Sequence, residues 1–434
     1  MDGHHDAVII GAGIIGCAIA LELARRGQRT LSLDALPAAG YGSTSASAAV
    51  IRVYYSTRLG TALAYEGYHY WQDWERHLGL PAGTPLARFV QAPSVVIKTA
   101  ENQELRPVCA LMRELGIPFE DWDAAALRAA LPFYDTARYA PPRRPDDPAF
   151  GESDGEVAGA VRFPTCGYVT DPQLAARNLQ QAALRHGAEF RFGAKVVAIE
   201  REGGRVAAVR LADGATIEAP VLINAAGPHS AKVNALAGVL GEMGVRTRPL
   251  RQEVAHLPAP PGADLDRRPL VCADGDVGCY WRSEVGGTLL IGGLEPACDP
   301  LEWVDDPDDW NDALTEQWTA QVYRAALRMP SLPIPGQAQG YAALYDVADD
   351  WIPIYDRTSL GGYYMAVGTS GNQFKNAPLV GVLMAELIAA CEAGHDHDRE
   401  PLRHVGRYTG HEIDLGFFSR RRTLNAQSSF SVLG

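Results

Sequence analysis

Three glycines near the start of the chain have the spacing of a turn that binds phosphate groups. The segment Gly11-Ala-Gly-Ile-Ile-Gly16 matches the pattern G-x-G-x-x-G, and Asp34 follows at the separation that the motif requires. Glycines let the backbone approach a pyrophosphate, the next helix supplies partial positive charge, and the acid accepts a hydrogen bond from a ribose hydroxyl. A packing turn alone would leave Asp34 unexplained, so the unit predicts a dinucleotide site.

The motif does not by itself distinguish NAD from FAD. Two features favour FAD: the motif begins close to the N-terminus, and no second nucleotide fingerprint occurs in the rest of the chain. An NAD-dependent dehydrogenase stays open as an alternative on the evidence of these residues alone.

Two cations later in the chain suggest that an anion binds nearby. Arg52 lies in the otherwise apolar run Ala48–Tyr55, and a guanidinium keeps its charge and suits a bidentate contact with a carboxylate. Lys375 precedes a helix expected to begin near Pro378, where the helix dipole disfavours a cation unless an anion is close. The alternatives are an internal salt bridge for Arg52, and a flavin phosphate contact or an exposed side chain for Lys375.

The spacing of apolar residues predicts the elements that position these side chains. Strands are expected at 6–11, 30–34, 189–200, 206–212, 216–223, 254–257, 278–282, 288–292 and 362–368, and helices at 14–26, 61–77, 171–186 and 378–391, with a helical region around 305–328. The first strand, helix and strand are typical of a doubly wound sheet. The Pro-rich and Gly-rich stretch 139–159 predicts a loop or a crossing between domains. The order of these blocks indicates two domains that interleave in sequence.

The composition is that of an ordinary globular protein. With 434 residues, of which 47% are hydrophobic and 21% charged, the chain is long enough for two or three domains. A net charge of -13 argues against a nucleic-acid partner, and we interpret the short run Arg420-Arg-Arg422 as a solvated face or tail. Seven scattered cysteines without C-x-x-C spacing indicate neither a disulfide framework nor a zinc site, so we expect a reducing, cytoplasmic location.

No membrane span, export signal or metal site is predicted. The apolar segment Ala7–Leu23 is interrupted by glycines and contains Glu22. Two histidine pairs, His4 with His5 and His395 with His397, lie in polar segments that we expect to be mobile, and metal binding is the weaker interpretation of both.

Six motifs together resemble a known family. They are Gly11–Gly16 with Asp34, then Gly42-Ser-Thr-Ser-Ala-Ser-Ala-Ala-Val-Ile-Arg-Val-Tyr-Tyr-Ser56, Gly167-Tyr-Val-Thr-Asp-Pro172, Ile223-Asn-Ala-Ala-Gly-Pro228, Leu344-Tyr-Asp-Val-Ala-Asp-Asp-Trp-Ile-Pro353 and Gly368-Thr-Ser-Gly-Asn-Gln-Phe-Lys-Asn-Ala-Pro378. In this order they resemble the glutathione-reductase-type FAD amine oxidoreductases, which include sarcosine oxidase and its beta subunit, dimethylglycine dehydrogenase, glycine oxidase and D-amino-acid oxidase. The resemblance covers nearly the whole chain.

The resemblance implies an α/β fold in which an FAD-binding domain with a parallel sheet interleaves with a substrate domain built on a mostly antiparallel sheet. We assign 1–90, 150–245 and 340–434 to the first domain, and 91–149 and 246–339 to the second. The implied cofactor residues are Gly11, Ala12, Gly13, Ile14, Ile15, Gly16, Asp34, Ser43, Thr44, Ser45, Val196, Ala226, Gly227, Gly371, Asn372, Gln373, Phe374 and Lys375.

The resemblance also implies a reaction: hydride transfer from the C–N carbon of an amino acid to the flavin, giving an imine that water hydrolyses. The residues that match Arg52 and Lys375 together hold the substrate carboxylate in the sarcosine oxidase pattern. Tyr345 matches a tyrosine that faces the substrate, and Tyr280 is expected on the ceiling of the pocket, although both could be core aromatics. No general base is assigned, because hydride transfer to a flavin does not require one.

Departures from the family pattern bear on the cofactor and the acceptor. Ala343-Leu344 stands where monomeric sarcosine oxidase has a flavin-linking cysteine, and Ser45–Ala49 contains no flavin-linking histidine, so we expect non-covalent FAD. Thr288–Gly292 lacks the lysine that activates oxygen in sarcosine oxidase, which leaves O2 and a protein electron acceptor both open.

The expected substrate is a secondary, N-methyl or cyclic imino acid. The alternatives are a D-amino-acid or glycine-type deaminating oxidase, and a flavoprotein subunit of a larger dehydrogenase with little activity alone. A homo-oligomer is a further possibility that these residues leave open.

Overall fold

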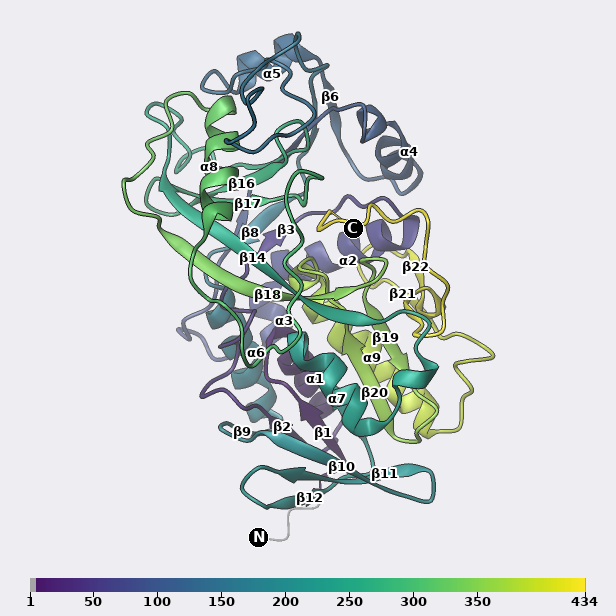
Figure 1. The fold of residues 1–434 in the computed structure, drawn as a ribbon. Coiled ribbons are helices and arrows are strands. Elements are labelled where there is room, and N and C mark those ends of the chain that lie inside the picture. The colour runs from purple at the N-terminus through teal and green to yellow at the C-terminus, as the bar shows by residue number, and fades with distance from the viewer. Residues whose placement is uncertain (1–4, 434) are drawn as a thin grey trace.

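The chain folds around two large sheets in the computed structural model, which describes residues 5–433 (Figure 1). The first sheet has six strands in the order β19 (Ile354–Arg357), β20 (Tyr363–Val367), β13 (Leu222–Asn224), β1 (Ala7–Ile10), β2 (Thr30–Leu33) and β9 (Glu189–Arg191). All neighbouring strands are parallel except β19 and β20. A strand covered on both faces needs apolar residues throughout, as β1 shows with four buried side chains.

Three helices pack together against the six-stranded sheet. Helix α1 (Ile14–Arg25) lies between α6 (Pro172–Arg185) and α9 (Ala377–Glu392), and its residues from Ile14 to Ala24 are all buried. Gly16 is required in this helix, because a Cβ atom there would lie 1.9 Å from the carbonyl oxygen of Gly11. The close contact brings the N-terminus of α1 directly against the glycine turn that follows β1.

The second sheet has eight strands and is mostly antiparallel. Their order is β18 (Gly340–Ala348), β14 (Thr247–Pro258), β17 (Thr288–Gly293), β16 (Cys279–Glu284), β15 (Val271–Asp274), β5 (Ser94–Ile97), β7 (Ala160–Phe163) and β6 (Glu120–Trp122). Only β15 and β5 pair in parallel among these strands. Helix α8 (Glu316–Arg328) packs on β14, β16 and β17 through Trp318 and Val322. The predicted fold class, with one parallel and one mostly antiparallel sheet, is confirmed.

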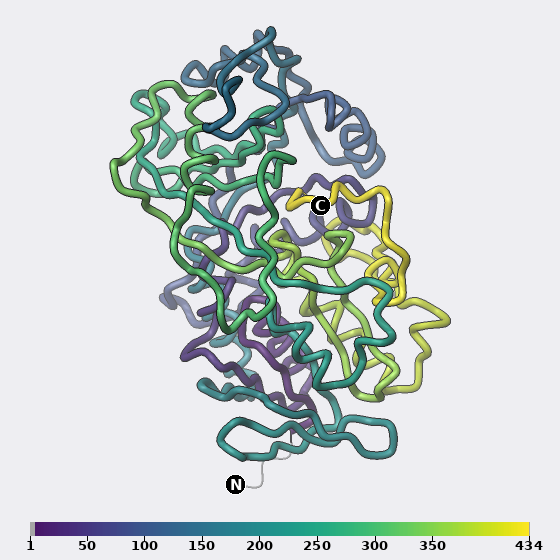
Figure 2. The backbone as a smooth tube through the Cα atoms, viewed as in Figure 1, coloured from purple at the N-terminus to yellow at the C-terminus, as the bar shows by residue number. Residues whose placement is uncertain are grey.

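The two sheets take their strands alternately from the chain, so segments far apart in sequence lie side by side (Figure 2). Strands β7 and β18 belong to the eight-stranded sheet, although they fall in the ranges 150–245 and 340–434 that we assigned to the FAD-binding domain. The domain boundaries themselves stay a prediction.

Smaller elements complete the fold. They are the sheets β10 (Val196–Glu202), β11 (Arg205–Leu211), β12 (Thr216–Glu218) and β3 (Val50–Ile51), β8 (Gly167–Val169), β4 (Phe89–Gln91), the pair β21 (Arg403–Val405) and β22 (Glu412–Asp414), and the helices α2 (Arg58–Gln72), α3 (Trp74–Leu78), α4 (Arg106–Glu114), α5 (Ala124–Ala130) and α7 (Ser230–Ala237). The single helix predicted at 61–77 is wrong, because the chain leaves the helical conformation at Asp73 (φ -104°, ψ 23°) and continues as α3.

The interpretation of Arg420 as part of a solvated run is wrong. Its side chain is fully buried and contacts three acids, with Nη1 at 3.0 Å from Asp356 and 2.8 Å from Asp398, and Nη2 at 2.8 Å from Glu242. Only Arg421 in this run has an exposed side chain.

The histidine segments also differ from expectation in part. His397 is buried, and its Nδ1 accepts the backbone N–H of Leu402 at 3.0 Å, so this part of the chain is ordered by packing. His4 lies outside the described residues.

Within residues 5–433 one helical segment, Phe374–Glu392, is long and apolar enough to cross a membrane by length and composition, but 67% of its most apolar 18-residue stretch is buried inside the molecule, as expected of a core helix. All seven cysteines are free.

Candidate active site

A single cavity of about 1020 Å³ extends from the glycine turn after β1 to the inner face of the eight-stranded sheet. The predicted residues that line it are Gly11, Gly13, Ile14, Ile15, Asp34, Ser43, Thr44, Ser45, Arg52, Val196, Ala226, Gly227, Tyr280, Tyr345, Gly371, Asn372, Gln373, Phe374 and Lys375. Ala12 and Gly16 do not line it but support the turn from behind. Their shared location brings the predicted residues together, while the role of each stays a prediction.

The acid of the dinucleotide motif is fixed by the backbone around it. Asp34 Oδ2 accepts the N–H of Ala12 at 2.7 Å, and Oδ1 accepts the N–H of Leu36 at 2.8 Å. Burial raises the pKa of Asp34, and the two backbone donors partly counteract that effect. The carboxyl is thereby held at the edge of the cavity, where a ribose hydroxyl can donate to it.

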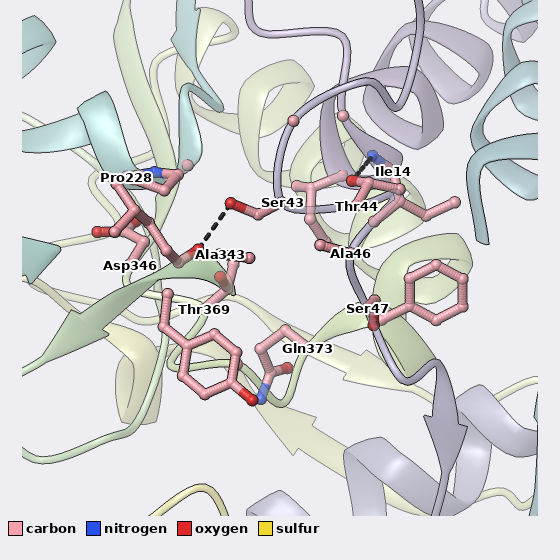
Figure 3. Close-up of a pocket in the computed structure, with 18 of the residues that line it drawn as sticks. Ile14, Ser43, Thr44, Ala46, Ser47, Pro228, Ala343, Asp346, Thr369 and Gln373 are labelled. Atoms are coloured by element: carbon pink, nitrogen blue, oxygen red, sulfur yellow. Dashed lines mark hydrogen bonds between the residues drawn. The ribbon is translucent and has the colours of Figure 1, made fainter. Parts of the chain in front are cut away.

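The N-terminus of α1 opens onto the cavity beside a polar turn (Figure 3). The N–H of Ile14 donates to Thr44 Oγ1 at 3.0 Å, and Ser43 Oγ donates to the carbonyl of Leu344 at 2.7 Å. Gly13, at the N-cap, offers no side chain to the first-turn N–H groups, which therefore suit an anion such as a pyrophosphate. The fixed acid, the uncapped helix end and the long cavity fit a bound FAD.

A loop before α8 closes the nucleotide end of the cavity. Asp308 and Trp310 of this loop line the cavity. Asp308 lies 3.0 Å from Lys195 Nζ, 3.1 Å from Lys232 Nζ and 2.9 Å from His229 Nε2. These exposed ion pairs connect the loop to Lys195, directly before β10, to His229, directly before α7, and to Lys232 in α7.

The other end of the cavity contains the two predicted cations, Arg52 and Lys375. Both are buried, with 5% and 3% of their surface exposed, so the exposed alternative for Lys375 is wrong. Both lie against the ring of Tyr55: Arg52 Cζ is 4.1 Å from its centroid, and Lys375 Nζ is 5.2 Å from the centroid and 2.9 Å from the hydroxyl. The fold therefore places two basic side chains around one tyrosine.

Neither cation has an acidic partner within residues 5–433, so Arg52 has no internal salt bridge in this part of the chain. Arg52 donates to the carbonyls of Tyr54 and Val432, the second at 2.9 Å, and Lys375 donates to the carbonyl of Asn372. Burial lowers the pKa of Lys375 well below its usual value, and the charge of Arg52 adds to the shift. Two adjacent buried cations without a counter-charge form a site for an anion.

Tyr345 and Tyr280 line the cavity from β18 and β16. A Cβ atom on Gly371 would lie 2.4 Å from the Tyr345 ring, so the glycine lets this ring lie flat against the segment before α9. Burial raises the pKa of Tyr280 to about 12 and that of Tyr345 well above its usual value, so both hydroxyls stay protonated at neutral pH. They can donate hydrogen bonds but do not serve as bases.

Three further residues at this end were not predicted. Glu295 has no basic partner in the described chain, and burial raises its pKa to about 8. Asp346 accepts the N–H of Gly368 at 2.6 Å, and burial raises its pKa to about 7. Tyr55 contacts both cations. Tyr55 and Asp346 lie inside motifs that we had quoted, three positions after Arg52 and directly after Tyr345, whereas no sequence signal marks Glu295.

Comparison with known proteins identifies a family model that spans most of the chain. The model described as DAO, FAD dependent oxidoreductase, matches residues 6–387. The match confirms the resemblance that the six motifs suggested.

Individual relatives are more distant. The probable sarcosine oxidase of Arabidopsis thaliana is 25% identical over 413 residues, which cover 91% of this chain and 90% of that protein. The peroxisomal sarcosine oxidase of Homo sapiens is 26% identical over 427 residues, covering 90% and 94%. The glycine oxidase of Geobacillus kaustophilus is 24% identical over 426 residues, covering 94% and 99%.

Solved structures share the fold. The L-proline dehydrogenase from P. horikoshii superimposes with a TM-score of 0.76 at 19% identity, covering 97% of this chain and 98% of that one. The glycine oxidase from Geobacillus kaustophilus gives a TM-score of 0.72 at 21% identity, covering 91% and 97%. At these identities the likeness supports the fold and does not assign a substrate.

Proposed function

The chain belongs to the FAD dependent oxidoreductase family, and from this premise we propose that it oxidises the C–N bond of a carboxylate-bearing amine. The favoured substrate is a secondary, N-methyl or cyclic imino acid, whose imine product water then hydrolyses. The observation that carries the proposal is the pair of buried cations, Arg52 and Lys375, without an acidic partner in the described chain. Relatives named as sarcosine oxidases support this substrate class.

The residues of the chain divide the binding task between the two ends of the cavity. Asp34, Thr44 and the N-terminus of α1 would hold the ribose and pyrophosphate of FAD. When bound, FAD supplies the acceptor for the hydride that leaves the carbon attached to nitrogen. Neither a cysteine at 343–344 nor a histidine at 45–49 is present to form a covalent link, which supports non-covalent binding.

At the substrate end, Arg52 and Lys375 would hold the carboxylate and thereby fix the position of the neighbouring C–N bond. Tyr280 and Tyr345 limit the space for water beside that bond, because their rings line the cavity from the eight-stranded sheet. Lys375 lies within the short helix Phe374–Asn376, just before α9, and the N-terminus of α9 adds partial positive charge at this end.

The experiment that tests the proposal is anaerobic reduction of the holoenzyme by amines. We expect sarcosine, L-proline, D-amino acids or glycine to bleach the flavin band. The order of their reduction rates separates a secondary or cyclic imino-acid substrate from the D-amino-acid and glycine alternatives. Amines of the same size that lack a carboxylate should not bleach it, and equal bleaching by them would contradict the proposal. Admission of air then shows whether O2 or another molecule accepts the electrons.

The variant Arg52→Ala tests the carboxylate contact directly. We expect kcat/KM to fall about 100-fold or more, because two charged hydrogen bonds of about 1.5–3 kcal/mol each are removed. Arg52→Lys keeps the charge but loses the planar guanidinium, so its kcat/KM should lie between those of the wild type and Arg52→Ala. If the variants retain flavin and unfold at an unchanged thermal midpoint, the fall in kcat/KM reflects weaker substrate binding. Loss of folding in both variants would instead assign Arg52 a structural role.

A further inference from the structure

The segment Ser428–Leu433 at the C-terminal end lies against the substrate end of the cavity. Val432 and Leu433 line the cavity together with Arg52 and Leu294. The Val432 side chain packs in a cluster that contains Leu250 and Tyr345.

The backbone of Val432 contacts two charged or ionisable groups. Its carbonyl oxygen accepts a hydrogen bond from Arg52 Nη2 at 2.9 Å. Its N–H donates to Glu295 Oε2 at 3.0 Å. In any residue the backbone nitrogen and the carbonyl carbon are bonded to the same Cα, which is also how the amine and the carboxylate of an α-amino acid are arranged. Val432 thus presents a nitrogen donor and an oxygen acceptor with the spacing of such a substrate.

Glu295 is suited to receive an amine. Its other carboxyl oxygen accepts from Gln252 Nε2 at 3.2 Å, so both oxygens act as acceptors and neither meets a cation within the described chain. The residue has a positive φ of 51°, a conformation that costs free energy in a non-glycine residue and is concentrated at functional sites. Its charge also influences Tyr280 and Tyr345, both of which line the cavity.

We propose that Arg52 and Glu295 form the two poles of a receptor for an α-amino acid, and that Val432 occupies this receptor as an internal mimic of the substrate. Arg52 takes the carboxylate and Glu295 takes the amine, so a ligand must carry both groups on one carbon and must displace the Val432 backbone. The inference rests on the proposed function, since it defines the substrate class of the same site.

The segment is held loosely enough to be displaced. Its other hydrogen bonds in the described chain are local: Ser428 N–H to the carbonyl of Asn425, Ser429 Oγ with Ser431 Oγ, Phe430 N–H to Ser428 Oγ, and Leu433 N–H to Ser431 Oγ. Val432 therefore provides the two hydrogen bonds that attach the segment to distant residues. A substrate zwitterion would replace the uncharged N–H and carbonyl groups of Val432 with an ammonium and a carboxylate, which adds charge to both hydrogen bonds.

The test uses two probes of the same shape, 2-aminoisobutyrate and pivalate, which differ by an ammonium group in place of a methyl group. Neither has a hydrogen on the carbon that would be oxidised, so both report binding without turnover. In the FAD-loaded full-length protein, Glu295→Gln should weaken 2-aminoisobutyrate about tenfold, the effect of one charged hydrogen bond, and leave pivalate unchanged. Dissociation constants come from the change in flavin absorbance. Glu284→Gln, at the end of β16, is the matched control and should change neither constant.

Hydrogen exchange supplies the second measurement. Saturating 2-aminoisobutyrate should make the amide of Val432 exchange about tenfold or more faster, because the probe replaces it on Glu295. The inference is overturned if Glu295→Gln weakens both probes equally, or if the Val432 amide exchanges at the same rate or more slowly with the probe bound. A protein that passes these tests but is bleached by no amine would contradict the proposed function alone, and the reverse result would contradict this inference alone.

Discussion

Two regions of this molecule contain buried basic side chains, and the regions differ in whether these side chains pair with acids. Arg324 and Arg328 on α8 are each about 1% exposed and are paired with acids: Arg324 contacts Asp299 at 2.6 Å, and Arg328 contacts Asp274 at 2.7 Å. Arg52 and Lys375, at the substrate end of the cavity, are nearly as buried but have no acid beside them in the described chain. The two arginines of α8 are neutralised by acids of the fold, whereas Arg52 and Lys375 are not, as the proposed contact with a substrate carboxylate requires.

Acids show the same contrast over a short stretch of sequence. Burial acts to raise the pKa of Asp299, but the hydrogen bonds and charge of Arg324 outweigh it and the pKa is lowered. Glu295, four residues earlier, has no such partner, and burial raises its pKa to about 8. Burying an ionisable group without a partner costs free energy, and groups with pKa values shifted in this way are concentrated at functional sites. The comparison therefore identifies the functional region without reference to any relative.

The largest effect should come from breaking a core pair. Arg328→Met would leave Asp274 and Asp276 buried without their cation, and we expect a loss of about 3–5 kcal/mol in the free energy of unfolding. Arg52→Met removes a charge without an acidic partner in the described chain and should cost less than about 1 kcal/mol, although we expect it to weaken carboxylate binding. Denaturant unfolding of the two variants, followed by circular dichroism, measures both values. Equal losses would contradict the division into paired and unpaired cations.

For Lys375→Met we expect a smaller change in the free energy of unfolding, and this change should be stabilising. Because burial lowers the pKa of Lys375, the folded protein binds fewer protons than the unfolded chain between that lowered value and the usual 10.5. The free energy of unfolding should therefore rise with pH across this window, and Lys375→Met should remove that slope. At neutral pH we expect the variant to be more stable than the wild type by about 1–3 kcal/mol while it binds carboxylates more weakly.

The measurement is the free energy of unfolding from pH 6 to 9 for the two proteins. Lys98→Met is the control, because Lys98 is mostly buried but pairs with Asp121 and donates to the carbonyl of Trp122. It should lose stability at every pH in this range. A destabilised Lys375→Met would show that Lys375 is part of the structural framework.

Local sequence predicted the parts of the site that depend on neighbouring residues. The glycine turn, the helix that follows it and Asp34 belong to one continuous strand, helix and strand. Their spacing is therefore sufficient to predict the contact between the turn and Asp34. Arg52 was found because a guanidinium in an apolar run is costly to bury. Lys375 was found because a cation precedes the N-terminus of a helix, and the structure places it immediately before α9.

Residues whose partners come from distant parts of the chain could not be found in this way. Glu295 follows a predicted strand and looks like a loop residue, and it accepts a hydrogen bond from the backbone of Val432, which is 137 positions later. Arg420 looks solvated in sequence, yet it meets acids that are 22, 64 and 178 positions away. Local patterns carry no information on such encounters, because tertiary packing decides them.

The smallest effect should come from the exposed ion pairs over the nucleotide end of the cavity. Lys232 is 42% exposed where it pairs with Asp306 and Asp308, and exposed pairs of this kind contribute about 0–1 kcal/mol. Lys232→Ala should therefore weaken FAD by no more than about fivefold, measured by quenching of flavin fluorescence. The difference from wild type should shrink between 50 and 500 mM salt, because salt screens exposed charges. Arg58→Ala, which breaks an exposed pair with Glu114 away from the cavity, should not change FAD affinity, and an equal effect of both variants would contradict a role for the loop in retaining the cofactor.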